Sequence, residues 1–281
     1  AMSAVGYSKY TNDLSAVMLT TGCGATNAVT GVLDAWGDNT PVIFISGQVK
    51  RKETSRNSKT NLRQFGVQEA DVISIVQSIT KYSIMINEPE DILFHLEKAT
   101  HLALSGRRGP VWIDIPLDVQ GISLEVDNLR HFEPPSKSIE EIQGLDEFIK
   151  LYNKSKRPII LAGNGVRLSG STDILKQFTY VNNLPCVVTY LGVDYFEQED
   201  INYVGRIGIK GDRAGNFAIQ NSDLIICLGS RLSTSQTGFE YNLFGREATL
   251  VVIDIDKEEH QKNTVQIDQF INADVGLFLE K

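Results

Sequence analysis

The first half of the chain alternates short apolar runs with segments of helical spacing. Three runs have the length and composition of strands buried on both faces, namely residues 16–20, 41–46 and 111–115. In residues 25–36 and 92–104, apolar residues recur every three or four positions, so these two segments are predicted to be helices. The stripe of the first helix ends at Trp36 and is expected to face the core, as is Trp112.

The same alternation resumes after a polar stretch. Pro134 and Pro135 resist both helix and sheet, so residues 126–139 are predicted to be a linker. Beyond it, the predicted strands are 158–162, 185–189, 224–228 and 250–255, and the predicted helices are 140–154, 172–182 and 214–221. Strands that alternate with helices are typical of parallel sheets covered on both faces. We therefore predict an α/β fold with two doubly wound parallel-sheet domains, residues 1–125 and 140–281.

Composition narrows the functional classes. Hydrophobic residues make up 42% of the 281 positions and charged residues 22%, as in an ordinary globular protein. With 27 Lys and Arg against 35 Asp and Glu, the net charge of −8 argues against binding to the phosphate backbone of a nucleic acid. No apolar run reaches the roughly 18 residues that span a membrane. The three scattered cysteines and four scattered histidines predict a reducing, cytoplasmic setting and no metal site.

Glycine-containing turns follow most of the predicted strands. In open parallel sheets, ligands bind beyond the carboxyl ends of the strands, where glycine lets the backbone approach a phosphate. Five segments fit that location, residues 22–24, 47–48, 163–165, 229–231 and 254–256. Asp254 or Asp256 could accept hydrogen bonds from a ribose. Because every α/β protein needs glycines at such turns, and none of these reads G-x-G-x-x-G, nucleotide binding and plain turn formation both stay open.

Other candidate chemistry is sparse. Residues 205–211 are glycine-rich and include Lys210, which fits a diphosphate site and a mobile polar loop equally well. No Ser/His/Asp or Cys/His spacing typical of a nucleophilic catalytic site stands out. Glu69 is expected to complement a helix dipole rather than act as a base, and Cys23 lies between two glycines without a partner base.

A series of short motifs runs through the chain in order. The first half contains GYSK (6–9), TTGCGATN (20–27), PVIFISGQV (41–49), QEAD (68–71), ITK (79–81) and SGRRGPVWIDIPLDVQ (105–120). The second half contains NSDLII (221–226), GSR (229–231) and IDID (253–256). In this order the motifs, which cover nearly the whole chain, resemble those of thiamine-diphosphate enzymes of the acetolactate synthase type.

The resemblance implies a domain plan. In this family the first of three α/β domains grips the aminopyrimidine of thiamine diphosphate, the central one often binds FAD, and the third holds the diphosphate and Mg²⁺. The chain resembles part of the first domain, residues 1–125, and the Rossmann-like central domain, residues 140–281. The family's catalytic glutamate would lie ahead of Ala1 and the diphosphate domain beyond Lys281, so the chain is expected to be a fragment that is inactive alone.

The resemblance also implies a reaction. Pyruvate or a similar 2-oxo acid would be decarboxylated and its two-carbon unit joined to a second carbonyl, as in branched-chain amino acid biosynthesis. A homodimer or homotetramer and a regulatory small subunit are implied. Residues 61–66 look more like relatives that transfer the unit to a ketosugar nucleotide in surface-polysaccharide synthesis. A non-catalytic FAD- or nucleotide-binding module is a further alternative.

Site residues carry over position by position. Gln68 matches the active-site glutamine near the reacting atoms, and the turn near the pyrimidine is matched by Gly22, Gly24 and Asn27. The residues expected to bind FAD or the phosphates of a cofactor are Arg107, Gly163, Gly165, Lys210, Gly211, Gly229, Ser230, Arg231, Asp254, Asp256 and Asp274. The sequence departs from the family where Cys23 replaces a proline, Val67 a phenylalanine and Lys210 a common histidine, which implies different substrate and FAD contacts.

Overall fold

A computed structural model describes residues 1–136 and 141–281 of the protein. The chain forms two compact units, residues 1–137 and 138–281, which divide inside the predicted linker. The end of that linker, residues 137–139, and the first position of the predicted helix 140–154 lie outside the described residues. In the described part of the chain, no helix is long and apolar enough to cross a membrane.

The first unit contains a four-stranded sheet in the order β1-β2-β4-β3, and all of its strand pairs are parallel. The strands are β1 (Ser15–Leu19), β2 (Val42–Gln48), β3 (Tyr82–Met85) and β4 (Val111–Pro116). The three strands predicted in this half are confirmed. The sequence prediction missed β3, which lies at the edge of the sheet and is only half-buried over most of its length.

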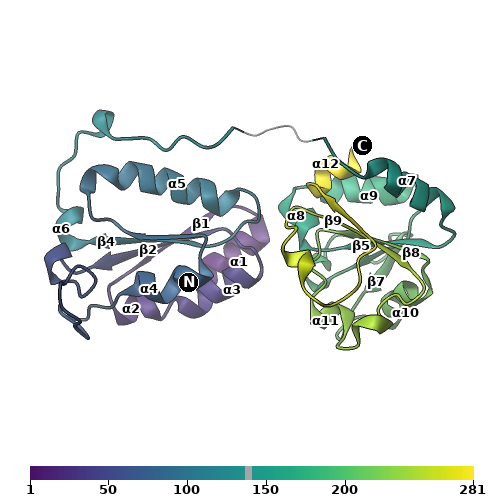
Figure 1. Ribbon diagram of the computed structural model, residues 1–281, viewed down its shortest axis with the longest axis horizontal. Coiled ribbons are helices and arrows are strands. Elements are labelled where there is room, and N and C mark those ends of the chain that lie inside the picture. The colour runs from purple at the N-terminus through teal and green to yellow at the C-terminus, as the bar shows by residue number, and fades with distance from the viewer. Residues whose placement is uncertain (137–140) are drawn as a thin grey trace. The chain divides into compact units, whose positions relative to one another are not determined.

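Helices cover both faces of this sheet. They are α1 (Met2–Thr11), α2 (Cys23–Thr26), α3 (Val29–Gly37), α4 (Val72–Val76), α5 (Ile92–Leu104) and α6 (Leu117–Gln120). Short 3₁₀ turns are η1 (Arg51–Glu53), η2 (Gln77–Ile79), η3 (Pro89–Asp91) and η4 (Val126–Asn128). In Figure 1, α5 lies on one face, and α1, α3 and α4 lie on the other.

The predicted helix 25–36 is divided into α2 and α3, and the predicted position of Trp36 is wrong. Trp36 is 41% exposed, whereas Val32 and Ala35 are fully buried. The helix packs through small residues because α1 comes close, and a Cβ on Gly31 would lie 2.9 Å from the Cβ of Ala1. The bulky side chain of Trp36 is therefore left on the outer face, away from the core.

Trp112 is buried, as predicted. It lies on β4 with no exposed surface and stacks on Phe44 of β2, with ring centroids 5.3 Å apart. The two residues are partners in the strand register, so the stack joins the two central strands of the sheet.

Part of the predicted linker is bound to α5. Arg130 Nη2 lies 3.0 Å from Asp91 Oδ1, and the backbone N–H of Phe132 donates to Glu97 Oε2 at 2.7 Å. The ring of Phe132 meets that of Phe94 edge-on at 5.7 Å. Residues up to Phe132 thus belong to the first unit and follow α5 (Figure 1).

The second unit contains a six-stranded sheet in the order β10-β9-β8-β5-β6-β7, again with parallel pairs throughout. The strands are β5 (Pro158–Ala162), β6 (Cys186–Val188), β7 (Tyr203–Arg206), β8 (Leu224–Leu228), β9 (Thr249–Asp254) and β10 (Gln269–Asn272). The four predicted strands occupy the centre of the sheet, and the two that were not predicted, β7 and β10, form its edges. Two doubly wound parallel sheets, as predicted, are therefore present.

Helices cover both faces of the second sheet as well. They are α7 (Leu145–Lys154), α8 (Asn164–Leu168), α9 (Thr172–Val181), α10 (Arg213–Asn221), α11 (Thr234–Thr237) and α12 (Val275–Leu279). The 3₁₀ turns are η5 (Tyr190–Gly192), η6 (Tyr241–Leu243) and η7 (Glu259–Gln261). Helices α7, α8, α9 and α12 contribute to one core, and α10 contributes to the core on the opposite face.

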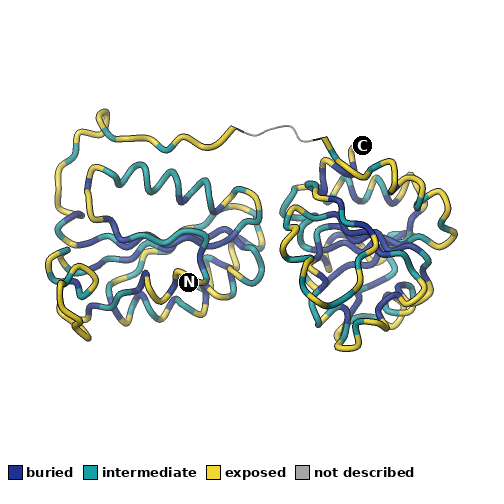
Figure 2. Tube along the Cα trace, in the orientation of Figure 1, coloured by how far each residue is buried: buried dark blue, intermediate teal, exposed yellow. Residues whose placement is uncertain are grey.

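Burial follows the two sheets, which appear as dark segments in Figure 2. Along β5, Ile160 and Ala162 belong to one core of the second unit, and Ile159 and Leu161 belong to the other. Successive side chains of a strand point to opposite faces, so a continuous apolar run is what a strand covered on both faces requires. The first unit has its own two cores.

Candidate functional site

The carboxyl ends of the strands of the first sheet lie together. We call this border of the sheet, which is distinct from its outer strands, the first edge and define it by residues 20–22, 48–49 and 116–117. Gly22 has a φ of +62°, and a Cβ at this position would lie 1.8 Å from the carbonyl oxygen of Gln68. Gln68 itself has a φ of +60°, and it is exposed. The fold therefore brings two predicted site residues into backbone contact, although 46 positions separate them in the sequence.

The other two residues of the predicted pyrimidine turn lie directly after Gly22. Gly24 is in α2, where a Cβ would meet Thr20 Cγ2 at 2.3 Å. Asn27 follows α2, is exposed, and donates its backbone N–H to the carbonyl of Cys23 at 3.1 Å. The three predicted residues are thus part of one short turn at the first edge.

Gln48, which the sequence analysis did not select as a site residue, holds this edge together. Its Oε1 accepts from Thr21 Oγ1 and from the backbone N–H of Val49, both at 3.0 Å. Its Nε2 donates to the carbonyl of Ala70 at 2.9 Å and to Asp114 Oδ2 at 3.0 Å. The sequence placed Gln48 in the candidate segment 47–48 and in the motif PVIFISGQV, but it assigned no role to this residue.

Asp114 is the buried carboxylate beneath Gln48. It is 1% exposed, and its Oδ1 accepts from Ser46 Oγ at 2.5 Å. Ser46 Oγ in turn accepts from Trp112 Nε1 at 2.8 Å. Burial raises the pKa of Asp114 from its ordinary value of 3.8 to about 6, against the opposing effect of the hydrogen bonds from Ser46 and Gln48. Nothing in the sequence singles out this aspartate within its strand.

The expectation for Glu69 is wrong. Helix α4 begins only at Val72, and Asp71 caps it by accepting from the backbone N–H of Ser74 at 3.3 Å. Glu69 is instead 5% exposed, and its Oε1 accepts from Ser55 N and Oγ at 3.0 and 2.6 Å. Its Oε2 accepts from the backbone N–H of Phe65 at 2.9 Å, so Glu69 orders the loop of residues 55–65.

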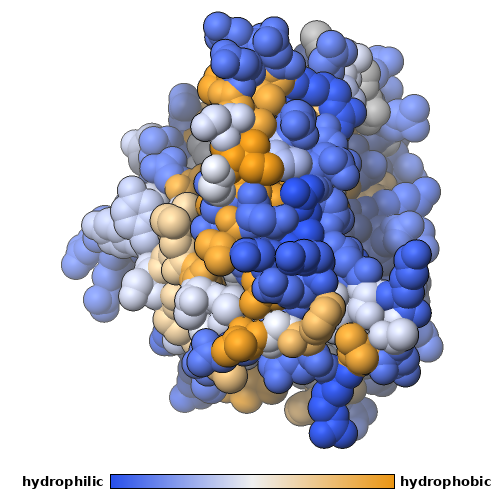
Figure 3. Space-filling view, turned by 90° about the vertical axis from the view of Figure 1, so that its left-hand side faces the viewer, coloured by the Kyte–Doolittle hydropathy of each residue, from blue (hydrophilic) through white to orange (hydrophobic). Residues whose placement is uncertain are grey.

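Apolar side chains are exposed beside these polar groups. Phe65 is 54% exposed, Val67 85% and Leu117 57%. Figure 3 shows the face on which α6 lies, where apolar side chains form a band between hydrophilic ones. An apolar surface beside a few directed polar groups is typical of sites that bind an organic ring.

Arg107 is not near this edge. Its Nε donates to Asn39 Oδ1 at 2.7 Å, and both residues precede strands of the first sheet. In a parallel sheet, residues ahead of the strands lie at the opposite edge from residues that follow them. The structure therefore separates Arg107 from Gly22 and Gln68.

The carboxyl ends of the second sheet form a second edge, defined by residues 163–165, 229–231 and 254–256. Here the glycines pack against each other. The backbone N–H of Gly165 donates to the carbonyl of Gly229 at 2.8 Å, and a Cβ on Gly163 would lie 2.4 Å from the same oxygen. Ser230 is 3% exposed and donates to Gln236 Oε1 at 2.9 Å. Close packing of two turns is thus one reason for glycine at these positions.

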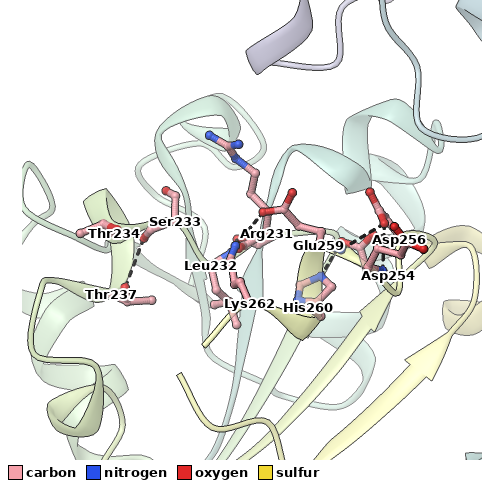
Figure 4. Close-up of polar contacts among 12 residues, drawn as sticks. Arg231, Leu232, Ser233, Thr234, Thr237, Asp254, Asp256, Glu259, His260 and Lys262 are labelled. Carbon is pink, nitrogen blue, oxygen red and sulfur yellow. Dashed lines mark hydrogen bonds and ion pairs between the residues drawn. The ribbon is translucent and has the colours of Figure 1, made fainter. Parts of the chain in front are cut away.

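Charged groups gather at the ends of β8 and β9 (Figure 4). Asp254 Oδ1 accepts from the backbone N–H of Asp256 at 2.9 Å. Lys262 Nζ lies 2.7 Å from Glu259 Oε1 and also donates to the carbonyl of Arg231, whose side chain is exposed. The predicted residues Arg231, Asp254 and Asp256 therefore belong to one polar cluster.

His260 belongs to the same cluster and was not predicted. Its side chain is 3% exposed, and neither ring nitrogen makes a hydrogen bond to any residue that the structure describes. Nε2 lies 3.4 Å from Asp254 Oδ2, and the ring packs against Phe270 at 5.4 Å. His260 could not be recognised from the sequence, because its partners Asp254 and Phe270 lie on two different strands.

The remaining predicted residues have separate positions. Lys210 is exposed after β7, and a Cβ on Gly211 would lie 2.5 Å from the carbonyl carbon of Ile207. Asp274 caps α12 by accepting from the backbone N–H groups of Gly276 and Leu277 at 2.9 and 3.3 Å. Among residues 1–136 and 141–281, no group of three or more His, Cys, Asp or Glu residues is placed to hold a metal ion.

Both units match known protein families. Residues 1–75 match the family "Thiamine pyrophosphate enzyme, N-terminal TPP binding domain", and residues 145–281 match "Thiamine pyrophosphate enzyme, central domain". The chain belongs to the thiamine pyrophosphate enzymes. Residues 20–22 and 48–49 of the first edge, together with Gln68, lie within the match to the TPP-binding domain, and the second edge lies within the match to the central domain.

Individual relatives agree. An acetolactate synthase large subunit from Lactococcus lactis is 36% identical over 283 residues, which is 99% of this chain and 47% of that protein. A probable acetolactate synthase large subunit from Methanocaldococcus jannaschii is 32% identical over 94% of this chain and 44% of its own. The isozyme 2 large subunit from Escherichia coli is 32% identical over 93% and 46%. The chain spans about half the length of the curated relatives it matches.

Proposed function

We propose that this chain supplies the pyrimidine-binding and central domains of an acetolactate synthase-like enzyme. The observation that carries the proposal is the contact between Gly22 and Gln68 at the first edge. It joins the turn that resembles the family's pyrimidine-contacting segment to the glutamine that resembles its active-site residue. The similarity to three acetolactate synthase large subunits supports the same reaction class.

The residues at the first edge fit thiamine diphosphate. Gly22, which lacks a side chain, lets the Gln68 segment lie against its turn, and exposed Asn27 and Gln68 offer amide donors and acceptors to a polar ring edge. Phe65 and Val67 provide apolar surface that excludes water from the reacting atoms. When bound, thiamine diphosphate supplies a carbon nucleophile and an electron sink for loss of carbon dioxide from a 2-oxo acid.

The proposed substrates are pyruvate or a similar 2-oxo acid as donor and a second carbonyl compound as acceptor. A ketosugar nucleotide is the second candidate acceptor. The small, 85% exposed side chain of Val67 favours it, because a larger acceptor needs room beside Gln68. Assembly as a homodimer or homotetramer and binding of a regulatory small subunit belong to the same proposal, as does a cytoplasmic location.

The second edge is proposed to bind FAD. Arg231 offers a cation for a phosphate, and Asp254 and Asp256 offer carboxylates for ribose hydroxyls. Mg²⁺ is proposed to accompany the diphosphate, and we assign it no ligand among the described residues. A purified protein that is yellow and releases FAD on denaturation would support this assignment, whereas a colourless one would contradict it.

The test of the reaction is carbon dioxide release from 2-oxo acids by the complete gene product with thiamine diphosphate and Mg²⁺. Gln68→Ala is expected to lower kcat/KM by about tenfold or more, because Gln68 would orient the reacting groups. Gln77→Ala, at an exposed position of the same unit, is the matched control and is expected to retain activity. No release across a panel of 2-oxo acids would overturn the proposal. Product analysis with pyruvate or a ketosugar nucleotide as acceptor separates the two candidate acceptors.

A further inference from the structure

A chain of buried hydrogen bonds runs from the core of the first sheet to the first edge. Trp112 Nε1 donates to Ser46 Oγ at 2.8 Å, and Ser46 Oγ donates to Asp114 Oδ1 at 2.5 Å. Gln48 Nε2 donates to the other carboxylate oxygen at 3.0 Å. All four residues are less than a tenth exposed, so water does not compete for these bonds.

Gln48 connects this buried chain of hydrogen bonds to two segments of the first edge, at Thr21 and at Ala70. Its side-chain amide uses both N–H donors, toward Asp114 and the carbonyl of Ala70, and its oxygen accepts from Thr21 and from Val49. Turning the amide over would place its oxygen against two acceptors, so its orientation is determined. Gln48 thereby ties the residue before Gly22 to the residue that lies two positions after Gln68.

We propose that Asp114 is a positioning residue for the first edge. Its carboxylate orients Gln48, and Gln48 holds the Gly22 turn against the Gln68 segment, so the geometry of this edge depends on whether Asp114 is ionised. For its effect on cofactor binding, the inference rests on the proposed function. The positioning itself does not.

Protonation of Asp114 disrupts the chain of hydrogen bonds whichever oxygen takes the proton. A proton on Oδ2 faces the N–H of Gln48, which then loses its acceptor. A proton on Oδ1 is donated to Ser46 Oγ, so the hydroxyl hydrogen of Ser46 loses Asp114 as its acceptor. Oδ2 then becomes a neutral carbonyl oxygen, which is a weaker acceptor for Gln48 than a carboxylate. Because burial raises the pKa of Asp114 to about 6, both states are accessible near neutral pH.

Few other charges act on Asp114. Its register partners, Ser46 on β2 and Met85 on β3, are uncharged. The charged groups that influence it are Asp71, at the start of α4, and Arg56, in the loop before it. Arg56 Nη1 lies 2.9 Å from Asp71 Oδ1, so the two groups form an ion pair. Asp71 raises the pKa of Asp114 and Arg56 lowers it, so their effects oppose one another.

The positioning is tested by NMR on the 281-residue chain between about pH 4.5 and about pH 8. We expect the indole N–H of Trp112 and the backbone N–H groups of Gly22 and Gln68 to shift with one common midpoint near 6. The chain has two tryptophans, and the exposed Trp36 serves as the internal reference. The indole signal of Trp36 is the one that disappears in the variant Trp36→Phe. We expect this signal to show no change, or step, with a midpoint near pH 6.

Two variants separate the links of the chain of hydrogen bonds. Asp114→Asn is expected to remove the step from all three signals. Asp34→Asn, which removes a half-buried carboxylate of α3 that pairs with Lys9, is expected to leave the step unchanged. Gln48→Met keeps the length of the side chain but removes its amide. The step is expected to persist at Trp112 and to vanish at Gly22 and Gln68. Gln48→Met also provides the test if Asp114→Asn fails to fold.

The inference is overturned if Gly22 and Gln68 show no step in common with Trp112, or if the step survives Asp114→Asn. In the complete gene product, Asp114→Asn is expected to raise the half-saturating concentration of thiamine diphosphate about tenfold, the effect of about one lost hydrogen bond. An unchanged value would overturn the link to cofactor binding. If the NMR step is present but no thiamine-dependent activity is found, the proposed function fails and the positioning role stands.

Discussion

At the scale of single residues, the first edge depends on the absence of a side chain at Gly22. Gly22 and the carbonyl of Gln68 approach more closely than any Cβ would permit, and both residues have a positive φ. For Gln68 this conformation costs about 1 kcal/mol or more, so the surrounding contacts must maintain it. Strain of this kind is common where a backbone is shaped for a ligand.

Replacement of Gly22 tests that dependence. Gly22→Ala is expected to destabilise the first unit by about 2 kcal/mol or more, because the added Cβ collides with backbone and the φ of +62° is unfavourable for alanine. Thermal unfolding followed by circular dichroism measures the change. Gly6→Ala is the control, since a Cβ there meets nothing within 4 Å and alanine favours a helix interior. An unchanged unfolding temperature for Gly22→Ala would contradict the contact.

Asp114 predicts a pH dependence of stability. Its pKa is raised by burial from 3.8 to about 6, so its contribution to stability is fully present below about pH 4 and is lost as the pH rises through 6. A difference of this size in pKa corresponds to ~3 kcal/mol. Urea unfolding of the wild type and Asp114→Asn should therefore show a stability difference that shifts against the wild type between pH 4 and pH 7. A pH-independent difference would contradict the raised pKa.

At the scale of elements, the central strands of both sheets were predictable, whereas three of the four edge strands were not. Strands such as β5 and β8 are continuous apolar runs because helices cover both of their faces. The missed strands β3, β7 and β10 lie at sheet edges, where partial exposure admits polar residues and the apolar run disappears. Hydrophobic pattern alone does not distinguish such strands from loops.

Helix α3 shows the same limit in another form. Apolar spacing favoured a stripe of four residues, Val29, Val32, Leu33 and Trp36. Val32 is fully buried and Val29 packs against the same core, but Leu33 and Trp36 are 55% and 41% exposed. The buried face carries Gly31, Val32 and Ala35, because the close approach of α1 leaves room only for small side chains. How much of the predicted stripe faces inward was decided by the neighbouring helix.

Glu69 provides a test at the level of one loop. Glu69→Ala is expected to loosen residues 55–65, because the backbone N–H groups of Ser55 and Phe65 both lose their acceptor. Limited trypsin digestion should then cleave faster after the basic residues of this loop. Glu90→Ala, at an exposed position of the same unit, is the control. Equal cleavage rates for the two variants would contradict the ordering role of Glu69.

At the scale of the whole molecule, each unit has its own sheet and its own cores. Within the described residues, the core clusters of the first unit and those of the second share no member. A separate core is what allows a unit to unfold as an independent cooperative block.

Calorimetry of matched core variants tests this independence. Leu161→Ala removes a fully buried side chain of β5 and is expected to cost the second unit about 2 to 5 kcal/mol. Ile113→Ala does the same on β4 of the first unit. We expect each variant to lower one unfolding transition and to leave the other in place. A common shift of both transitions would show that the units unfold together.

The sequence by itself determined the class of this protein: two parallel α/β units, their central strands, their turns and the order of motifs that resembles the thiamine-diphosphate enzymes. These features depend on local pattern, which a single chain displays directly. Only the tertiary structure decided that Gly22 meets Gln68, that Glu69 orders a loop, and that Gln48 and Asp114 support the first edge. The contacts of Gly22, Gln48 and Asp114 join residues that are far apart along the chain, and those of Glu69 depend on how its loop folds back. The burial that gives Asp114 its raised pKa exists only once the sheet has formed.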